Sequence, residues 1–118
     1  MSNTSLSPLQ PAARIYISGP IAHHDLKERK ARFKSFYRKL KDLGYNPFNP
    51  FDNGVSDDAP YQAHMKADIC MLLLCDYILM MEGWEHSKGC KLELDVASSC
   101  GIPVLFESTF FKKQKTNK

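Results

Sequence analysis

The sequence predicts an α/β fold, a three-layer flavodoxin- or Rossmann-like parallel sheet of four to five strands with helices on both faces. Short apolar runs of strand length alternate with longer segments whose apolar residues recur at helical spacing. The strand candidates are apolar throughout, which is typical of parallel strands buried on both faces. A length of 118 residues leaves room for one domain with its own core.

The first half of the chain is predicted to hold a buried strand, a helix and an edge strand. Residues 14–18 form the strand, which a Gly-Pro pair ends. Residues 25–43 form a helix with one apolar stripe, and eight Lys or Arg residues are placed on its solvated face. Two prolines limit residues 45–51 to a short edge strand, because proline cannot donate to a ladder. Residues 52–60 are an acidic, turn-rich loop.

The second half repeats the helix and the strand twice. Residues 61–74 carry apolar side chains at helical spacing, and the apolar run 77–81 is expected to be a central strand. A helix follows from residue 87 or 88 to 100, ended by Gly101, and residues 102–106 are the last strand. The buried face of that last helix is expected to consist of Leu92, Val96 and Cys100.

The basic excess of the chain lies at its C-terminus. The formal net charge is +3, but the last eleven residues hold four lysines and no acid, which leaves −1 for the remainder. We therefore interpret residues 108–118 as a basic tail, residues 1–13 as a flexible arm, and residues 14–107 as the single domain. This distribution does not favour a nucleic-acid partner.

Cysteine spacing and hydropathy predict a cytoplasmic protein with no metal, cofactor or membrane partner. The cysteines form no CxxC pair and adjoin apolar stretches, so we expect four buried, reduced thiols. The histidines form no metal-binding pattern, and neither GxGxxG nor a Walker lysine motif is present. We see no secretory leader and no apolar run long enough to cross a bilayer.

Several polar residues should converge at one edge of the sheet. Ligands of such sheets bind beyond the carboxyl ends of the strands, where the strand order reverses. Ser87 begins a helix there, and its hydroxyl and the nearby amides can hold a phosphate or hydroxyl group. Glu93 and Asp68 each interrupt a largely apolar helix face, where a carboxylate needs a partner or a function. The alternative interpretation of Glu93 and Asp68 is that they are ordinary surface carboxylates, and the alternative for Tyr16 is an ordinary core residue.

Four motifs together resemble the nucleoside 2-deoxyribosyltransferase superfamily, including its deoxynucleoside 5′-monophosphate N-glycosidase branch, over residues 14–106. The motifs are IYISGPI at 15–21, Asp68 eight residues before Asp76, Ser87-x-Gly89-x-x-x-Glu93-x-x-x-Ala97, and Gly101-Ile-Pro103-Val. The resemblance implies that Glu93 is the nucleophile, that Asp68 assists departure of the base by proton transfer, and that Tyr16 orients the nucleophile. The substrate-binding residues are then expected to be Ser18, Gly19, Pro20, Ile21, His23, Trp84, Ser87 and Gly89.

The implied reaction is cleavage of the N-glycosidic bond of a (deoxy)nucleoside 5′-monophosphate or nucleoside. It would pass through a covalent glycosyl-Glu93 intermediate and end in hydrolysis or in transfer to another base. Serine at position 87, where members acting on free nucleosides tend to carry Asp, favours the monophosphate. The resemblance also implies a homo-oligomer, a dimer or larger. The alternative interpretation is a non-catalytic nucleotide-binding or sensing module on the same fold.

Overall fold

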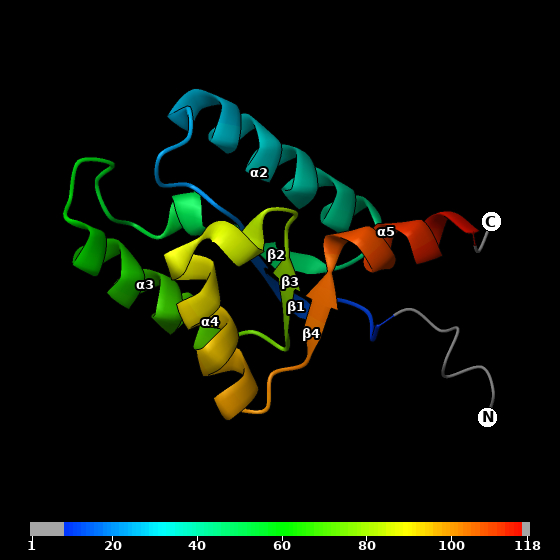
Figure 1. The fold of residues 1–118 in the computed structure, drawn as a ribbon. Helices are drawn as coiled ribbons and strands as arrows, with labels where there is room; N and C mark the ends of the chain where they lie inside the picture. Colours follow the sequence, from blue (N-terminus) through cyan, green and yellow to red (C-terminus); the bar gives the residue numbers. More distant parts are fainter. Residues whose placement is uncertain (1–8, 117–118) are drawn as a thin grey trace.

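The computed structural model describes residues 9–116 and contains a four-stranded, fully parallel sheet (Figure 1). The strand order is β2-β1-β3-β4, so β1 lies between β2 and β3 and the order reverses there. This order confirms the predicted flavodoxin-like α/β fold. The strands are β1 (Arg14–Ser18), β2 (Asn46–Phe48), β3 (Tyr77–Met80) and β4 (Val104–Phe106).

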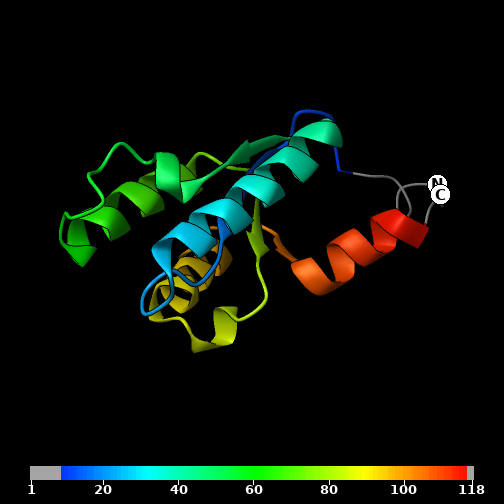
Figure 2. The same ribbon diagram turned by 90° about the horizontal axis from the view of Figure 1, so that it is seen from above.

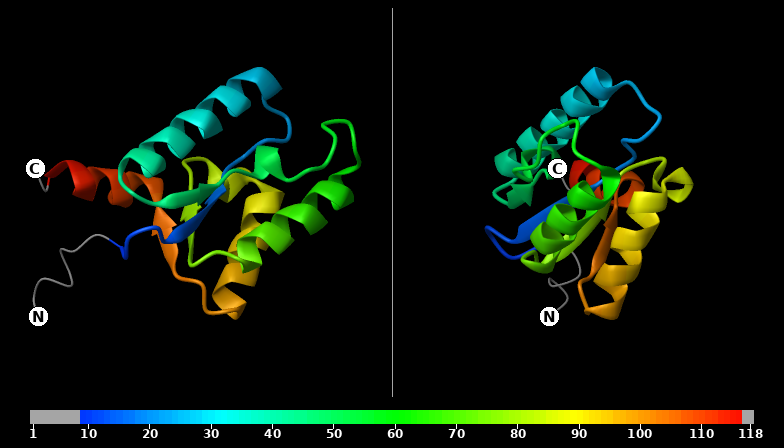
Figure 3. Two further views of the ribbon diagram at one scale, coloured as in Figure 1. Left: turned by 180° about the vertical axis from the view of Figure 1, so that it is seen from behind. Right: turned by 90° about the vertical axis from the view of Figure 1, so that its left-hand side faces the viewer.

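Helices cover both faces of the sheet, as the alternating pattern predicted. The helices α2 and α5 pack on one face, and α3 and α4 lie side by side on the other (Figures 2 and 3). None of the helices described is both long and apolar enough to cross a membrane. The helices are α2 (Leu26–Asp42), α3 (Tyr61–Leu73), α4 (Lys88–Ser99) and α5 (Glu107–Thr116), with short 3₁₀ turns η1 (Pro50–Asp52) and η2 (Trp84–His86).

Successive side chains of β1 point to opposite faces of the sheet and so into two separate core clusters. Ile15 and Ile17 point into the cluster beneath α2 and α5. Tyr16 points into the opposite cluster, beneath α3 and α4. Ser18 follows Tyr16 by two residues and so faces the same side. Two hydroxyl groups of one buried strand therefore face α4.

The buried face of α4 differs from the predicted one. Leu92 and Cys100 are exposed, and Val96 is only partly buried. The residues that face the sheet are Cys90, Glu93 and Ala97, at spacings of three and four along the helix. Glu93, a carboxylate, lies in the middle of this buried stripe. Because the prediction followed apolar residues only, it selected the neighbouring face of the helix.

Parts of the predicted arm and tail belong to the folded domain. Leu9 packs against the α2–α5 core, and the Ala12 amide donates to the Gly44 carbonyl at 2.9 Å. At the other end, α5 places Phe110 in that core with only 8% of its surface exposed, and Phe111 packs edge-on against Phe36. The segment 108–116 is thus a helix docked by aromatic residues, while residues 1–8 and 117–118 lie outside the described residues.

Two of the cysteines and one arginine of α2 differ in burial from the prediction. Cys75 and Cys90 are buried, but Cys70 on α3 and Cys100, the C-cap of α4, are exposed. Arg29, one of the eight basic residues assigned to the solvated face of α2, is 7% exposed. Its Nε donates to the Pro20 carbonyl at 2.7 Å, so it holds the loop that follows β1.

Candidate active site

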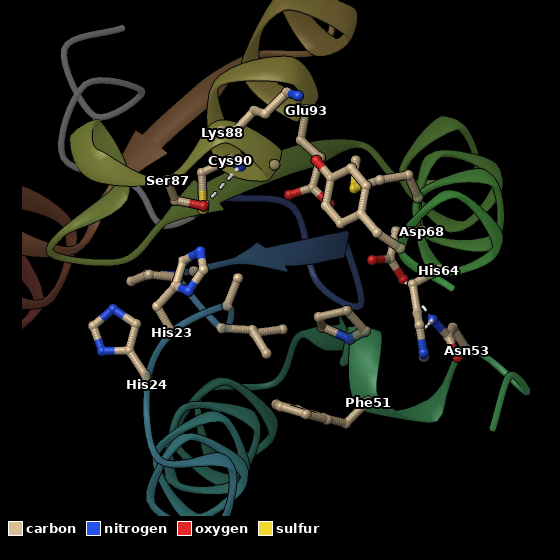
Figure 4. Close-up of a pocket in the computed structure, with 18 of the residues that line it drawn as sticks. His23, His24, Phe51, Asn53, His64, Asp68, Ser87, Lys88, Cys90 and Glu93 are labelled. Carbon is tan, nitrogen blue, oxygen red and sulfur yellow. Dashed lines mark hydrogen bonds between the residues drawn. The ribbon is translucent and has the colours of Figure 1, made fainter. Parts of the chain in front are cut away.

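A cavity of about 590 Å³ opens beyond the carboxyl ends of β1 and β3, where the strand order reverses. Its walls come from the loop after β1, the η1 loop, the first turns of α3 and the first turns of α4 (Figure 4). Segments far apart in the sequence therefore meet at the edge that the sequence predicted.

Glu93 is the buried carboxylate of this cavity. It is 5% exposed, and each of its oxygens accepts one hydrogen bond from β1. The Tyr16 hydroxyl donates to Oε2 at 2.8 Å, and the Ser18 hydroxyl donates to Oε1 at 2.6 Å. Burial, together with a smaller contribution from Asp68, raises the pKa of Glu93 to about 7, although the Ser18 and Tyr16 hydroxyl donors act in the opposite direction.

Tyr16 is fixed as a hydrogen-bond donor by its surroundings. Its ring is fully buried, and burial together with the neighbouring Glu93 carboxylate raises the pKa of its hydroxyl well above the usual value. The phenol therefore keeps its proton and donates it to Glu93 at ordinary pH. Tyr16 and Ser18 both lie behind Glu93 and hold both of its oxygens in place.

Asp68 is the second buried carboxylate of the cavity and projects from α3. It is 7% exposed, and burial raises its pKa. The Asn53 amide, which donates to Asp68 Oδ1 at 2.8 Å, lowers that pKa, as does His64. Sequence reasoning missed both neighbours. The sequence could have indicated His64, because residues four apart on a helix lie on the same face. It could not have indicated Asn53, which comes from a loop.

The N-terminus of α4 forms the other end of the cavity. Ser87 is its N-cap, and the Ser87 Oγ accepts the Cys90 amide at 3.2 Å. The amides of Lys88 and Gly89 belong to the first turn, where N–H groups have no carbonyl partner within the helix. His23 lies on the same side of the cavity as Ser87 (Figure 4), with a backbone φ of 68°. This end offers N–H donors and a positive helix dipole to an anion.

Most of the predicted residues line the cavity, but Trp84 does not, and Tyr16 and Ser18 are buried against Glu93 rather than on the cavity wall. Instead, Trp84 packs against Phe106, with ring centroids 5.8 Å apart, and lines a separate cleft of about 240 Å³. Gly83, with a φ of 91°, turns the chain toward β4 just before it. The predicted residues that line the cavity are Gly19, Pro20, Ile21, His23, Asp68, Ser87, Gly89 and Glu93.

Gly19 is required by packing as well as by its place on the wall. A Cβ atom there would lie 2.4 Å from the Met81 sulfur and 2.9 Å from Cζ of Phe33. Both distances are too short for real side-chain contacts. The glycine therefore lets the loop after β1 lie close against the core beneath the site.

Comparisons with known proteins agree with this architecture. A family described as a domain of unknown function, DUF4406, matches residues 13–106. No curated protein matches the sequence significantly. Three similar solved structures share the fold, as the motif resemblance predicted, but at 19–24% identity they show no more than the fold.

Two of these structures are 2-deoxyribosyltransferases. The enzyme from Bacillus psychrosaccharolyticus has a TM-score of 0.62 and 21% identity over 80% of this chain and 71% of its own. The enzyme from Leishmania mexicana has a TM-score of 0.64 and 24% identity over 80% and 63%. The third structure is the CMP N-glycosidase BcmB from Clostridium botulinum. It has a TM-score of 0.55 and 19% identity over 79% of this chain and 66% of its own. The chain thus spans about two thirds of the length of its structural neighbours.

Proposed function

The chain belongs to the DUF4406 family, and we propose that it cleaves the N-glycosidic bond of a nucleoside 5′-monophosphate or nucleoside. One observation carries the proposal. Glu93 is a buried carboxylate on a ligand-sized cavity, with a hydroxyl donor on each oxygen and no ion-pair partner among the side chains of residues 9–111. Burying a carboxylate without a counter-ion is costly, and a nucleophile on a ligand-binding cavity accounts for that cost.

The proposed reaction uses the two carboxylates in different protonation states. An oxygen of ionised Glu93 attacks C1′ of the sugar through an oxocarbenium-like transition state, and the C1′–N bond breaks. Asp68 gives a proton to the departing base, and Glu93 is left esterified to the sugar. Water, or a second base, then attacks C1′ and gives a proton back to the Asp68 carboxylate, while the ester bond breaks and releases Glu93 as a carboxylate. The donors Tyr16 and Ser18 hold Glu93 in position throughout.

The N-terminus of α4 supports a monophosphate as the preferred substrate. Ser87 uses its oxygen to accept the Cys90 amide, which leaves its hydroxyl proton free to donate to a phosphate. An acid at this position would repel the phosphate, whereas the amides of Lys88 and Gly89 attract it. His23 and His24 line the same end and add donors.

A product assay tests the proposed function. The protein is incubated with nucleosides and with their 5′-monophosphates, with and without a second base, and the products are separated by chromatography. We expect free base from at least one monophosphate, faster than from the matching nucleoside. Binding of nucleotides without release of base would favour the non-catalytic nucleotide-binding module instead.

We also propose that the chain forms a homo-oligomer through α3 and α4. Leu73, Leu74 and Leu92 are 50%, 58% and 43% exposed on these two helices, an unusual group of apolar side chains for a free surface. Light scattering after gel filtration should give at least a dimer, and a triple substitution of the leucines to Ser should give a monomer. A wild-type monomer would contradict this proposal.

A further inference from the structure

We propose that Asn53 is a positioning residue that sets which oxygen of Asp68 carries the proton given to the leaving base. The inference rests on the proposed glycosidase function and concerns the same site. Asn53 follows η1 in the loop between β2 and α3, and its side chain reaches across to two residues of α3. Nothing in the sequence pattern marked it.

The orientation of the Asn53 amide is fixed by its own loop. The Val55 backbone N–H donates to Asn53 Oδ1 at 2.8 Å, so this end of the amide must be the oxygen. A flipped amide would place its NH₂ group against the Val55 N–H and lose that bond. The other end, Nδ2, therefore presents two hydrogens toward α3.

Both hydrogens have acceptors on α3. Nδ2 lies 2.8 Å from Asp68 Oδ1 and 3.2 Å from His64 Nδ1. Because His64 Nδ1 accepts, the proton of the neutral imidazole sits on Nε2. Because Asp68 Oδ1 accepts this bond more strongly as the unprotonated oxygen, a proton on Asp68 is favoured on Oδ2. Figure 4 shows the Asp68 carboxyl group between the Asn53 and His64 side chains and the open cavity.

This arrangement reserves one Asp68 oxygen for chemistry. A general acid is effective only when its proton points along the path of transfer, within hydrogen-bond reach of the leaving atom. Asn53 occupies the oxygen that faces the loop and leaves the other one to deliver the proton. Without Asn53, the proton on Asp68 could sit on either oxygen and the carboxyl group could rotate.

The variant Asn53→Asp tests this role with almost no change of shape. The new side chain can still accept the Val55 N–H, but it presents a carboxylate to Asp68. The two acids would then share a proton between them, which draws it to Oδ1 and away from the base. Ser56→Ala is the matched control, because the Ser56 hydroxyl bonds to Asp58 in the same loop and lies outside the cluster.

Two leaving groups separate proton transfer from the other steps. One substrate is the nucleotide identified by the product assay, and the other is the 4-nitrophenyl glycoside of the same sugar phosphate. Its nitrophenolate leaves without a proton. Asn53→Asp should lower kcat/KM for base release about 100-fold and change nitrophenol release by less than about three-fold. Ser56→Ala should leave both rates unchanged. Equal losses on both substrates, or no loss on either, would overturn the inference.

A second measurement reports on the network without using activity. Imidazole ¹⁵N NMR of the wild type, above the pH at which the ring is charged, should show His64 with its proton on Nε2. In Asn53→Asp the proton should move to Nδ1. Should Asn53→Asp fail to fold, Asn53→Ala replaces it in the rate comparison, with a loss in the same direction. A wild-type His64 that carries its proton on Nδ1 would overturn the inference, whereas a wild type that releases neither leaving group would contradict the proposed function.

Discussion

Tyr16→Phe tests whether the strand hydroxyls control the ionisation of Glu93. The substitution keeps the fully buried ring and removes only the hydroxyl that donates to Glu93 Oε2 at 2.8 Å. A buried hydrogen bond to a charged group contributes about 1.5–3 kcal/mol. That corresponds to a rise of about one to two units in the pKa of Glu93, since one unit is about 1.4 kcal/mol.

The consequence for activity follows from the starting pKa of Glu93, which is about 7. At pH 7 about half of the wild-type carboxylate is ionised, and in Tyr16→Phe only about a tenth to a hundredth would be. Attack by Glu93 at this pH should therefore slow about 5- to 50-fold. The deficit should shrink as the pH rises, because the variant then ionises as well.

The assay is the pH dependence of kcat/KM for nitrophenol release, which does not need the proton from Asp68. The acid limb should have its midpoint near pH 7 in the wild type and about one to two units higher in Tyr16→Phe. Tyr45→Phe is the matched control, because Tyr45 is a buried tyrosine in the other core cluster. A uniform loss at every pH, with an unmoved midpoint, would refute the reasoning.

Three further predictions concern stability, measured by urea denaturation. Burial raises the pKa of Glu93 from 4.5 to about 7, so the folded state loses stability as this carboxyl ionises. Between pH 4 and pH 9 the free energy of unfolding of the wild type should therefore fall by up to about 3 kcal/mol relative to that of Glu93→Gln. Parallel curves of unfolding free energy against pH for the two proteins would contradict this. Gly19→Ala should destabilise the fold by about 1–3 kcal/mol, because its Cβ meets Met81 and Phe33; a neutral effect would show that the loop has room. Phe110→Ala should cost about 3–5 kcal/mol, whereas a free C-terminal tail would tolerate it without loss.

The fold was predictable because buried parallel strands are short and apolar throughout. The segments that became β1 and β3 stand out for this reason, and Gly44 and Gly101 mark helix ends at positive φ. The helix α5 was missed because its lysines conceal the two aromatic residues that dock it. Only these two aromatic residues mark the buried side of α5, too few to show a helical repeat of apolar residues.

The site was only partly predictable, for a different reason. Glu93 and Asp68 could be singled out because each interrupts an apolar helix face, and the structure buries both. Asn53 could not, because the turn conformation of η1, rather than any sequence spacing, brings its amide to Asp68. Trp84 was misplaced since the direction of the chain after β3 depends on the positive φ of Gly83.

The most direct test of the central claim is to trap the sugar on Glu93. The protein is incubated with a 2-fluoro-2-deoxy-arabinosyl nucleotide, whose electron-withdrawing fluorine slows breakdown of a glycosyl-enzyme, and is then digested and analysed by mass spectrometry. We predict a sugar phosphate adduct on the peptide that contains Glu93, and none in Glu93→Gln. Base release by the wild type with no adduct, or with an adduct on another residue, would contradict Glu93 as the nucleophile.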